Sequence, residues 1–360
     1  MGGVMDMCAA AVRGAIIAPR GKKLVISDLS NIEGRGLTWA ADEQWKLQAF
    51  RDFDAGIGWD LYVLAYARAF NIDPATVDKA MRQIGKVLEL ALGYQGGVAA
   101  FCTMAVTYGL DLLKLADAAY GTIPAATLDE ARDFLQWLYS KCEKRHVARV
   151  RKGVDQDQSR AKLESEKEEA RLGLPEKVFI VCDSLKRLWR GAHVSIAHKE
   201  TGFWKLLETA AKSAILEGGV HAVGKHMQFD KYQAWLRLRL PSGRYLCYPG
   251  AKLNDAGEIS YMGVNQYSRK WQRLKTYGGK LSENATQALS RDVMAHNMPA
   301  IEAAGYEIVL TVHDEIVTEA PDSPEFNAPH LSSLLATNPP WAPDLPLAAG
   351  GFETYRYRKQ

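Results

Sequence analysis

Two aspartates stand at the ends of apolar strand patterns and could together hold metal ions. Asp28 follows the apolar run 24–26, and Asp314 lies at a tight turn between the strand patterns 306–312 and 316–317. They are 286 residues apart in the chain (314 minus 28). Two carboxylates on adjacent strands could bridge two Mg²⁺ ions roughly 3.5–4 Å apart, one activating a hydroxyl and the other neutralising a triphosphate. Because Mg²⁺ prefers hard oxygen ligands, aspartate suits this chemistry.

Each of these acidic positions also has a structural interpretation. Taken alone, Asp28 is more often the N-cap of the helix that follows it. At the turn, the adjacent carboxylates Asp314 and Glu315 have apolar flanks, and this favours a binding function over a purely structural turn. His313, taken alone, is more often a turn histidine with satisfied hydrogen bonds.

A second set of candidates is cationic. Arg82 and Lys86 are four residues apart on a predicted helix, 74–92, that begins after Asp73-Pro74, so they share one face. Such cations could neutralise the non-bridging oxygens of a triphosphate. The glycines at 93–97 indicate a helix end or the close approach of a ligand. A surface helix with two solvated cations is the more common explanation of this spacing.

The elements that would position these residues follow from periodicity. We expect a buried strand at 22–30, a hairpin within 232–250 and a loop at 321–350, with an edge strand at the end of the sequence. Helices are expected at 31–50, 203–218 and 283–304. The charged segment 141–171 predicts one solvated helix, or two with a break near Gly153, with a nucleic-acid role as the less common alternative. The most basic region with interleaved aromatic residues is 231–280.

Bulk properties set limits on the class of protein. A length of 360 residues suits about two domains, and 47% hydrophobic with 24% charged residues permits a sizeable core. The net charge of +3 says little about nucleic acid. Five dispersed cysteines without a CxxC pair argue against a disulfide framework or a zinc knuckle and fit a reducing cytosol. Arg13 interrupts the first apolar run, and no run reaches 18 residues, so we expect neither a signal peptide nor a membrane span.

Read in order, three segments resemble the motifs of family A DNA polymerases, the bacterial DNA polymerase I group and its phage relatives. DLSNIEGR at 28–35 resembles the first palm motif, normally DYSQIELR. RQIGKVLELALGYQGG at 82–97 resembles the fingers motif RxxxKxxxFxxxYG. VHDE at 312–315 is the family's usual third motif. The basic, aromatic-containing region 231–280 is more similar to the phage branch.

This resemblance implies roles for the catalytic residues and a cofactor. Asp28 and Asp314 would bind two Mg²⁺ ions, which Mn²⁺ could replace, and the carbonyl of Leu29 would be a further ligand. Glu315 would be a secondary carboxylate near the primer end. Lys86 would bind the triphosphate and could also protonate the leaving pyrophosphate.

The resemblance also implies contacts with the partners, which would be dNTPs and primer-template DNA. Residues implied to contact the nucleotide or primer are Glu33 as a steric gate hydrogen-bonded to Tyr94, Arg82 on the triphosphate, Leu90 near the sugar and His313 at the primer terminus. Residues implied to contact DNA are Asn284, Gln287 and Arg35, with Gly96 and Tyr94 beside the nascent base pair.

The chain departs from the family pattern at several positions. Leu90 stands where Phe or Tyr is usual, which should alter discrimination against dideoxynucleotides, while Glu89 and Gln95 replace the usual Asn and Gly. The first and third motifs are farther apart than in bacterial enzymes, and we place the extra residues within 110–280. Because 27 residues precede Asp28, we expect the thumb and exonuclease domains to be absent. Either a separate polypeptide carries them or the sequence is a truncated reading frame.

The sequence thus predicts an α+β fold with a small antiparallel palm sheet and an inserted, mostly helical fingers domain. The expected domains are palm at 1–55, fingers with the basic hairpin region at 56–280, and palm again at 281–360. The expected function is DNA-templated DNA polymerisation, with a cytoplasmic location, in the bacterial host if the chain is phage-encoded. One alternative is an inactive or incomplete module that binds DNA or a partner subunit, and another is a two-metal nuclease, which would have no use for Arg82 and Lys86.

Overall fold

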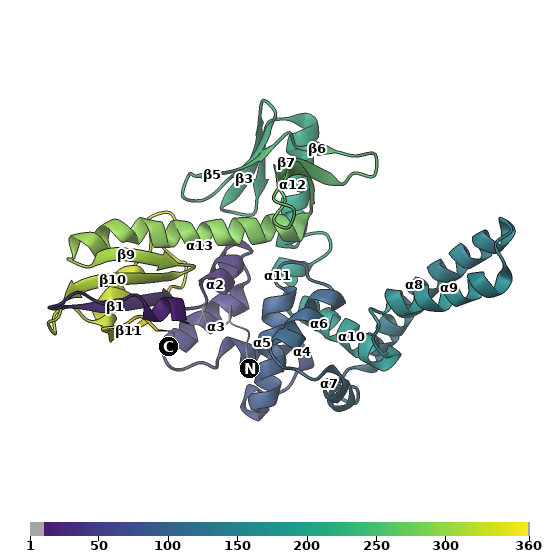
Figure 1. Cartoon of the computed structure of the whole chain (residues 1–360), viewed down its shortest axis with the longest axis horizontal. Helices are drawn as coiled ribbons and strands as arrows, with labels where there is room; N and C mark the ends of the chain where they lie inside the picture. The colour runs from purple at the N-terminus through teal and green to yellow at the C-terminus, as the bar shows by residue number, and fades with distance from the viewer. Residues whose placement is uncertain (1–10, 359–360) are drawn as a thin grey trace. The chain divides into compact units, whose positions relative to one another are not determined.

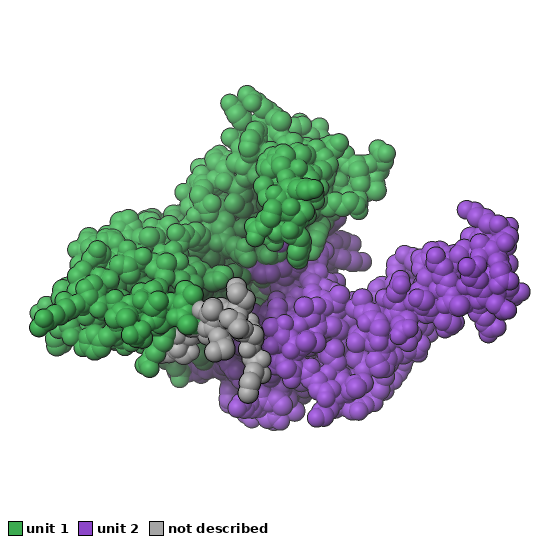
Figure 2. Space-filling view, viewed as in Figure 1, with its two compact units in different colours: residues 1–56, 206–277, 281–360 green, residues 57–205, 278–280 purple. Residues whose placement is uncertain are grey.

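The computed structural model describes residues 11–358, which divide into two compact units (Figure 2). Of the described residues, unit 1 takes those up to Gly56, then 206–277, and those from Leu281 onward. Unit 2 takes 57–205 and 278–280. The first division is one residue from the expected boundary, but 206–277 groups with unit 1, whereas the sequence had placed it with the helical insertion.

A four-stranded antiparallel sheet forms the centre of unit 1. Its strands are β1 (Lys22–Leu29), β9 (Glu307–Val312), β10 (Glu315–Pro321) and β11 (Ala349–Thr354), in the order β11-β1-β10-β9 (Figure 1). The small antiparallel sheet and the edge strand near the C-terminal end are therefore confirmed, as is the mixed α+β class. Asp28 pairs with Glu315 in the register of β1 and β10, which brings the two acidic segments side by side.

Apolar side chains pack on both faces of this sheet. Because side chains alternate along a strand, successive residues of β1 belong to the apolar clusters of opposite faces. Val25 and Leu29 pack with Ile316 against the helices α13 (Gly278–Ala303) and α14 (Ala328–Leu335). Leu24 and Ile26 pack on the opposite face with Val317, Phe352 and Tyr357. Asp28 has the parity of Leu24 and Ile26, so it lies on this second face, at the end of its apolar row.

Three predicted elements differ from the structure. The helix expected at 31–50 is two helices, α2 (Ile32–Ala40) and α3 (Gln44–Asp54), because Asp42 takes a left-handed conformation with φ 57° between them. The helix expected at 74–92 is a 3₁₀ turn, Pro74–Thr76, followed by α5 (Lys79–Leu92). The loop expected at 321–350 contains α14, which Asn327 caps by accepting a hydrogen bond from the amide of His330.

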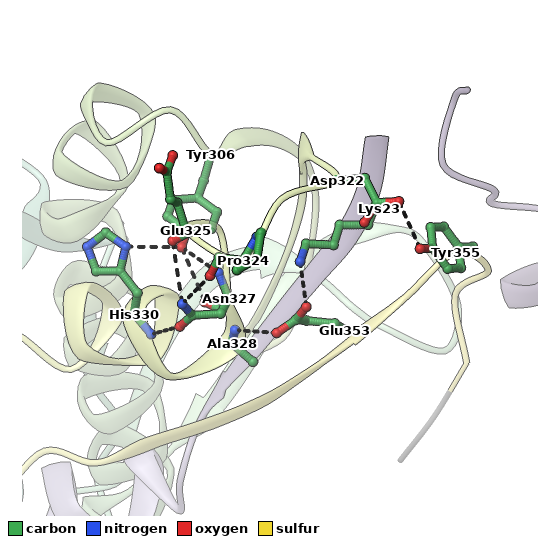
Figure 3. Close-up of polar contacts among 10 residues, drawn as sticks. All are labelled: Lys23, Tyr306, Asp322, Pro324, Glu325, Asn327, Ala328, His330, Glu353 and Tyr355. Carbon is green, nitrogen blue, oxygen red and sulfur yellow. Dashed lines mark hydrogen bonds and ion pairs between the residues drawn. The ribbon is translucent and has the colours of Figure 1, made fainter. Parts of the chain in front are cut away.

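Figure 3 shows polar contacts that join β11 to β1 and to α14. Glu353 of β11 accepts from Lys23 of β1 at 2.7 Å and from the amide of Ala328, the first residue of α14, at 3.2 Å. The hydroxyl of Tyr306 contacts His330 Nδ1 at 3.1 Å. These contacts explain why a segment rich in proline is ordered here.

Residues 220–277 form a separate small β structure in unit 1, called the β-module below. One sheet has the order β2-β3-β4-β5, with β2 (Val220–Val223), β3 (Met227–Tyr232), β4 (Trp235–Arg239) and β5 (Tyr245–Pro249). The other is β6-β7-β8, with β6 (Lys252–Leu253), β7 (Ile259–Val264) and β8 (Trp271–Thr276). The predicted hairpin is thus β4 and β5, within a larger antiparallel structure.

The β-module is joined to the rest of unit 1 by polar contacts with α13 and by a ring stack with α2. Asp292 of α13 accepts from Ser242 Oγ at 2.5 Å and from Arg244 Nε at 2.7 Å. The ring of His226 stacks on Trp39 at a centroid distance of 3.8 Å, and burial lowers the pKa of His226 below its usual value. These contacts account for the grouping of 206–277 with unit 1.

Unit 2 is helical. Its helices are α4 (Leu61–Phe70), α5, α6 (Val98–Thr107), α7 (Leu112–Ala119), α8 (Ala125–Arg151), α9 (Gln156–Ala170), α10 (Glu176–Ala192) and α11 (Val194–Ala197), and α12 (Phe203–Glu217) begins in it. The charged segment 141–171 is two helices broken after Arg151, as one of the predictions had it. The helices α8 and α9 lie side by side (Figure 1). Glu166 pairs with Arg149 at 2.7 Å and Arg145 at 3.2 Å, so ion pairs join them.

Within residues 11–358, no single helix is both long and apolar enough to cross a membrane. The helices α6 and α7 meet the length and composition test only when taken together, and they are bent by 116° at the break between them.

Gly85 allows α4 and α5 to approach closely, so a larger residue at this position should destabilise the fold. A Cβ at position 85 would lie 2.0 Å from the carbonyl oxygen of Tyr62. We expect Gly85→Ala to lower the free energy of unfolding by about 1–3 kcal/mol, because overpacking outweighs the better helix propensity of alanine. Chemical denaturation followed by circular dichroism measures this. Gly191→Ala is the control, since its Cβ would meet no atom within 4 Å, and equal stability of the two variants would contradict the prediction.

Candidate active site

A two-residue turn carries the acidic third motif. β9 ends at Val312 and β10 begins at Glu315, so His313 and Asp314 form the turn, with His313 in the left-handed region at φ 56°. The amide of Leu29 donates to the carbonyl oxygen of Asp314 at 3.2 Å. This bond ties the end of β1 to the turn. The side chain of Asp314 is thus held next to the end of the strand that carries Asp28.

Asp28 lies inside β1 and is not a helix cap, so the N-cap interpretation of this residue is wrong. The N-cap of α2 is Asn31, three residues later, in a left-handed conformation with φ 49°. Asp28 is exposed although its neighbours in β1 are buried. A carboxylate held by a buried strand and open to solvent is well placed to bind a ligand.

A cavity of about 300 Å³ brings the acidic residues together. Asp28, Asp314 and Glu315 line it, together with His313 and Arg13. Its walls also include Gly350 and Gly351 of β11, which leave room beside Asp28. Three carboxylates beside one arginine make this an electronegative site, which suits a cation.

The carboxylates of this cavity suit a Mg²⁺ ion that takes its remaining ligands from water and substrate. Among residues 11–358, no group of three or more His, Cys, Asp or Glu side chains is arranged to hold a metal ion by itself. Mg²⁺ is commonly held by one or two carboxylates, and water and substrate phosphates complete its octahedral shell. Asp28 and Asp314 therefore suit metals that arrive with a nucleotide.

Glu315 is held by Tyr357, a contact that the sequence did not reveal. Tyr357 is buried, with 3% of its surface exposed, and its hydroxyl donates to Glu315 Oε1. Burial, followed by the hydrogen bond to Glu315, raises the pKa of Tyr357 to about 12. The hydroxyl therefore stays protonated near neutral pH and holds the carboxylate of Glu315, which lines the cavity.

Removing this hydroxyl should disturb Glu315 without disturbing Asp28 and Asp314, the predicted metal ligands. For the nucleotide addition that the three motifs predict, we expect Tyr357→Phe to lower the kcat roughly tenfold, because a carboxylate that is no longer held shifts within the site. The dNTP KM should change little, and the loss should be the same from pH 6 to 9, because Tyr357 is protonated throughout. Steady-state primer extension measures both constants.

Tyr355→Phe is the matched control for Tyr357→Phe. The hydroxyl of Tyr355 donates to Asp322 at 2.8 Å, away from the cavity (Figure 3). If Tyr357→Phe lowered the melting temperature and left kcat at the level of the control, Tyr357 would be structural only.

A second cavity, of about 430 Å³, begins at the same turn. His313 and Asp314 line both cavities, and the second also has Glu33, Gln287 and Arg291 in its walls. The structure therefore brings the candidate steric gate, Glu33, close to the acidic turn within unit 1. The predicted pairing of Glu33 with Tyr94 stays a prediction.

Asn284, Gln287 and Arg291 lie on one side of α13, at spacings of three and four residues. Gln287 and Arg291 are exposed and line the second cavity, whereas Asn284 donates to the hydroxyl of Tyr248 in β5 at 3.3 Å. Sequence analysis did not select Arg291. The signal was available, because Arg291 continues the face that Gln287 begins.

Arg35 has a structural role in this fold, contrary to the prediction that it contacts DNA. Only 2% of its surface is exposed. Its guanidinium donates to both carboxylate oxygens of Asp54, at 2.6 and 2.7 Å, and to the carbonyl oxygens of Ser30 and Pro346. With its donors used inside unit 1, Arg35 is not available to a nucleic acid.

In unit 2, α5 presents the cationic residues on one face, as predicted. Arg82 donates to Asp60 at 3.0 Å, and Asp60 also caps α4 by accepting from the amides of Tyr62 and Val63. The ammonium of Lys86 lies 4.4 Å from the centre of the Tyr108 ring. Leu90 continues this face and is 39% exposed.

The turn after α5 is held by contacts that explain one departure from the motif. The side-chain oxygen of Gln95 accepts from the amide of Gly279 at 2.8 Å, and the carbonyl oxygen of Gly93 accepts from Trp204 at 3.0 Å. At Gly96 a Cβ would lie 1.9 Å from the carbonyl oxygen of Ala91, so this position requires glycine. Tyr94, which is half-buried, lies within this fixed turn.

Glu89, the other departure, faces the interior of unit 2. Its Oε1 accepts from Trp189 Nε1 at 2.9 Å and lies 2.9 Å from His193 Nε2. Nδ1 of the buried His193 faces the carbonyl oxygen of Trp189 at 2.8 Å. Glu89 therefore joins α5 to α10 and is not part of the cationic face.

Comparison with known proteins gives one relative by sequence. The chain is 30% identical over 356 residues to the DNA polymerase of Bacillus phage SP02, covering 97% of this chain and 43% of that protein. The chain thus spans less than half the length of this relative. No family model matches the chain.

Among solved structures, the chain is similar to the polymerase domain of Pol1 from M. smegmatis, in complex with a DNA primer-template and a dNTP. The identity is 14%, the TM-score is 0.43, and the match covers 97% of this chain and 42% of that one. The resemblance to phage-type DNA polymerases expected from the three motifs is confirmed by the phage relative, which matches nearly the whole chain.

Proposed function

We propose that this chain is the catalytic core of a DNA-templated DNA polymerase of family A, similar along nearly its whole length to a phage enzyme. One observation carries the proposal: the first and third motifs, 286 residues apart (314 minus 28), place Asp28, Asp314 and Glu315 around one cavity. The sheet of unit 1 would be the palm, and unit 2 would be the fingers. The β-module would then be attached to the palm.

In this proposal Asp28 and Asp314, with the carbonyl of Leu29, would hold two Mg²⁺ ions, for which Mn²⁺ could substitute. When bound, the ions would make the primer hydroxyl more acidic and would neutralise charge on the triphosphate. Tyr357 holds Glu315 beside this site, and His313 positions the primer terminus from the turn between the two cavities.

The second cavity would receive the sugar and the primer-template. Glu33 would exclude a ribose 2′-hydroxyl by filling the space that this hydroxyl needs, and Gln287 and Arg291 would contact the primer-template from α13. Asn284 would act from the same helix, beside the β-module. Because Glu33, Gln287 and Arg291 share one cavity with Asp314, the sugar and the reacting phosphate would be selected together.

The face of α5 would bind the triphosphate. Arg82 would exchange Asp60 for a phosphate oxygen, and Lys86 would neutralise charge on the transferring phosphoryl group and protonate the leaving pyrophosphate. Leu90 would lie near the sugar, and Tyr94 and Gly96 beside the new base pair. Primer-template DNA and dNTPs are the proposed partners, and a separate polypeptide with thumb and exonuclease functions stays a prediction.

Primer extension tests this function. A labelled hairpin with a short single-stranded template is incubated with the chain, Mg²⁺ and each dNTP singly, then with all four. We expect addition of the nucleotide complementary to the next template base, full extension with all four dNTPs, and no addition when EDTA is present. Addition that ignores the template base, or degradation of the primer without extension, would contradict the proposal.

A further inference from the structure

The four-stranded sheet of the β-module exposes an aromatic and cationic face. Strand pairing places Tyr232, Trp235, Arg237, Arg239 and Tyr245 on one side of β3, β4 and β5. The alternate residues, among them Phe229, Leu236, Leu238 and Tyr248, are buried on the other side. The three aromatic side chains on the open side remain 56%, 44% and 37% exposed, in the order Tyr232, Trp235, Tyr245. We call this side the open face.

The open face is preorganised by one arginine. The guanidinium of Arg237 lies 4.7 Å from the ring centre of Tyr232 and 4.6 Å from that of Tyr245. Asp230 accepts two hydrogen bonds from Arg237, at 2.7 and 2.9 Å, so the guanidinium cannot rotate freely. Since Asp230 neutralises Arg237, the arginine orients the two rings more than it adds charge. Rings that are fixed and open to solvent suit flat ligands.

A cavity that contains Arg239 lies at the end of the open face. It measures about 240 Å³ and is lined by Gln228 and Arg239, which are paired across β3 and β4, and by Lys225 and His226. Lys225 is paired with Asp42 at 2.5 Å, so Arg239 supplies the charge that is open to a ligand. Arg239 is paired with Tyr245 across β4 and β5, so the cavity begins beside an aromatic ring. Among the described residues, none forms an ion pair with Arg239. A phosphate group would fit this cavity chemically.

The charge of the β-module favours a polyanion over an apolar partner. Residues 220–277 contain ten Lys and Arg against three Asp and Glu, an excess of seven, whereas the whole chain has a net charge of +3. Aromatic rings, oriented arginine and a basic groove are the features with which proteins bind single-stranded nucleic acid. A duplex would not suit the rings, because its bases are stacked on one another.

We propose that the open face binds single-stranded DNA, with bases stacked on Tyr232, Trp235 and Tyr245 and a phosphate at Arg239. The three residue pairs along β3 and β4, from Tyr232–Trp235 to Gln228–Arg239, span roughly 13 Å at the usual rise of a strand, room for a few nucleotides. The identity of the strand rests on the proposed function, because unpaired template is the single strand that a polymerase meets. The contacts of Asp292 with Ser242 and Arg244 connect this face to α13, the helix of Gln287.

Binding of a labelled oligothymidylate to the full chain, followed by fluorescence anisotropy, tests the proposal. Alanine at Tyr232, Trp235 or Tyr245 should raise the Kd roughly 5- to 100-fold, the usual range for a lost base stack. Arg239→Ala should make the dependence of log Kd on log salt shallower by about one unit. Controls are Tyr267→Ala and Trp271→Ala, which remove aromatic rings that are 97% and 61% exposed elsewhere in the β-module.

A thiol-protection measurement on the unmodified chain gives an independent readout. Cys247 is exposed and is paired with Arg237 across β4 and β5, so it lies on the open face. Bound oligothymidylate should slow its reaction with a maleimide several-fold, and a blunt duplex of equal length should slow it less. Equal Kd values for the open-face and control variants, or unprotected Cys247 at saturating oligonucleotide, would overturn the proposal.

Extension of a primer with a template overhang of one nucleotide reports the proposed function separately. Tyr232→Ala should weaken this extension less than it weakens extension over a long template, because so short an overhang cannot reach across the open face. Extension over a long single-stranded template should be weakened by the same substitution. The oligonucleotide affinity is measured without dNTPs, so it tests the open face whether or not the chain extends a primer.

Discussion

Asp314→Asn reduces templated extension about a thousandfold or more, the largest effect that we expect of any single substitution. Asparagine has the shape of aspartate but no charge, so it is a weak ligand for Mg²⁺ and cannot compensate two cations. The turn should survive the change, since asparagine suits a two-residue hairpin turn and the amide of Leu29 bonds to the backbone of residue 314. The measurement is single-turnover nucleotide addition at saturating dNTP and Mg²⁺.

Glu307→Gln is the matched control for Asp314→Asn. It also removes a carboxylate charge from the strand pair β9–β10, but Glu307 is exposed and pairs with Lys22 at 2.6 Å outside the cavities. Its activity should stay within about twofold of the original, since surface ion pairs contribute little. If Asp314→Asn kept a tenth of the activity while folded, the assignment of Asp314 as a metal ligand would fail.

Lys86→Ala should have the second-largest effect, a fall in kcat of about 10²- to 10³-fold, the usual loss when one charge-stabilising donor is removed from a transition state. Lys86 shares its face of α5 with Arg82, and its ammonium lies over the ring of Tyr108, which limits its freedom. The fold should tolerate alanine, a good helix former, at a position on the open side of the helix.

This variant also separates polymerase from nuclease chemistry. A two-metal nuclease needs the paired carboxylates but not a cation on α5, so nuclease activity would persist in Lys86→Ala. Lys79→Ala is the control, because Lys79 is exposed and stands at the first position of the same helix. Degradation of a labelled primer that is unaffected by Lys86→Ala, without extension by the original chain, would favour the nuclease.

Local patterns were enough to predict the elements that carry the acidic site. The apolar run before Asp28 and the two apolar flanks of His313-Asp314 are properties of neighbouring residues, and β1, β9 and β10 form where these patterns lie. The order of the three motifs along the chain resembles that of family A DNA polymerases, and this resemblance indicated that the first and third motifs lie together. The strand register that sets Asp28 opposite Glu315 is the physical reason that this pairing works.

What sequence reasoning missed depends on contacts between distant segments. Arg35 lies in a motif, but it is buried and donates hydrogen bonds to Asp54 and to the carbonyl oxygen of Pro346. Tyr357 gains its partner, Glu315, from a strand 42 residues away. Helix α14 is different, because its cap, Asn327, and the proline at its start are local signals. Those signals were outweighed by the proline-rich composition of the surrounding segment.

The order of strands in the central sheet has a consequence for synthesis of the chain on the ribosome. β1 pairs with β10 and β11, which are made almost 300 residues later, while unit 2 is encoded between them. At about 5–20 residues per second, the apolar residues Leu24 and Ile26 wait roughly 15 to 60 seconds for their partners. During that interval the nascent strand has unpaired edges, which favour aggregation. Unit 2, whose helices make local contacts, has time to fold first. Growth at low temperature and the supply of chaperones should therefore govern the yield of folded protein more than the stability of the finished sheet does.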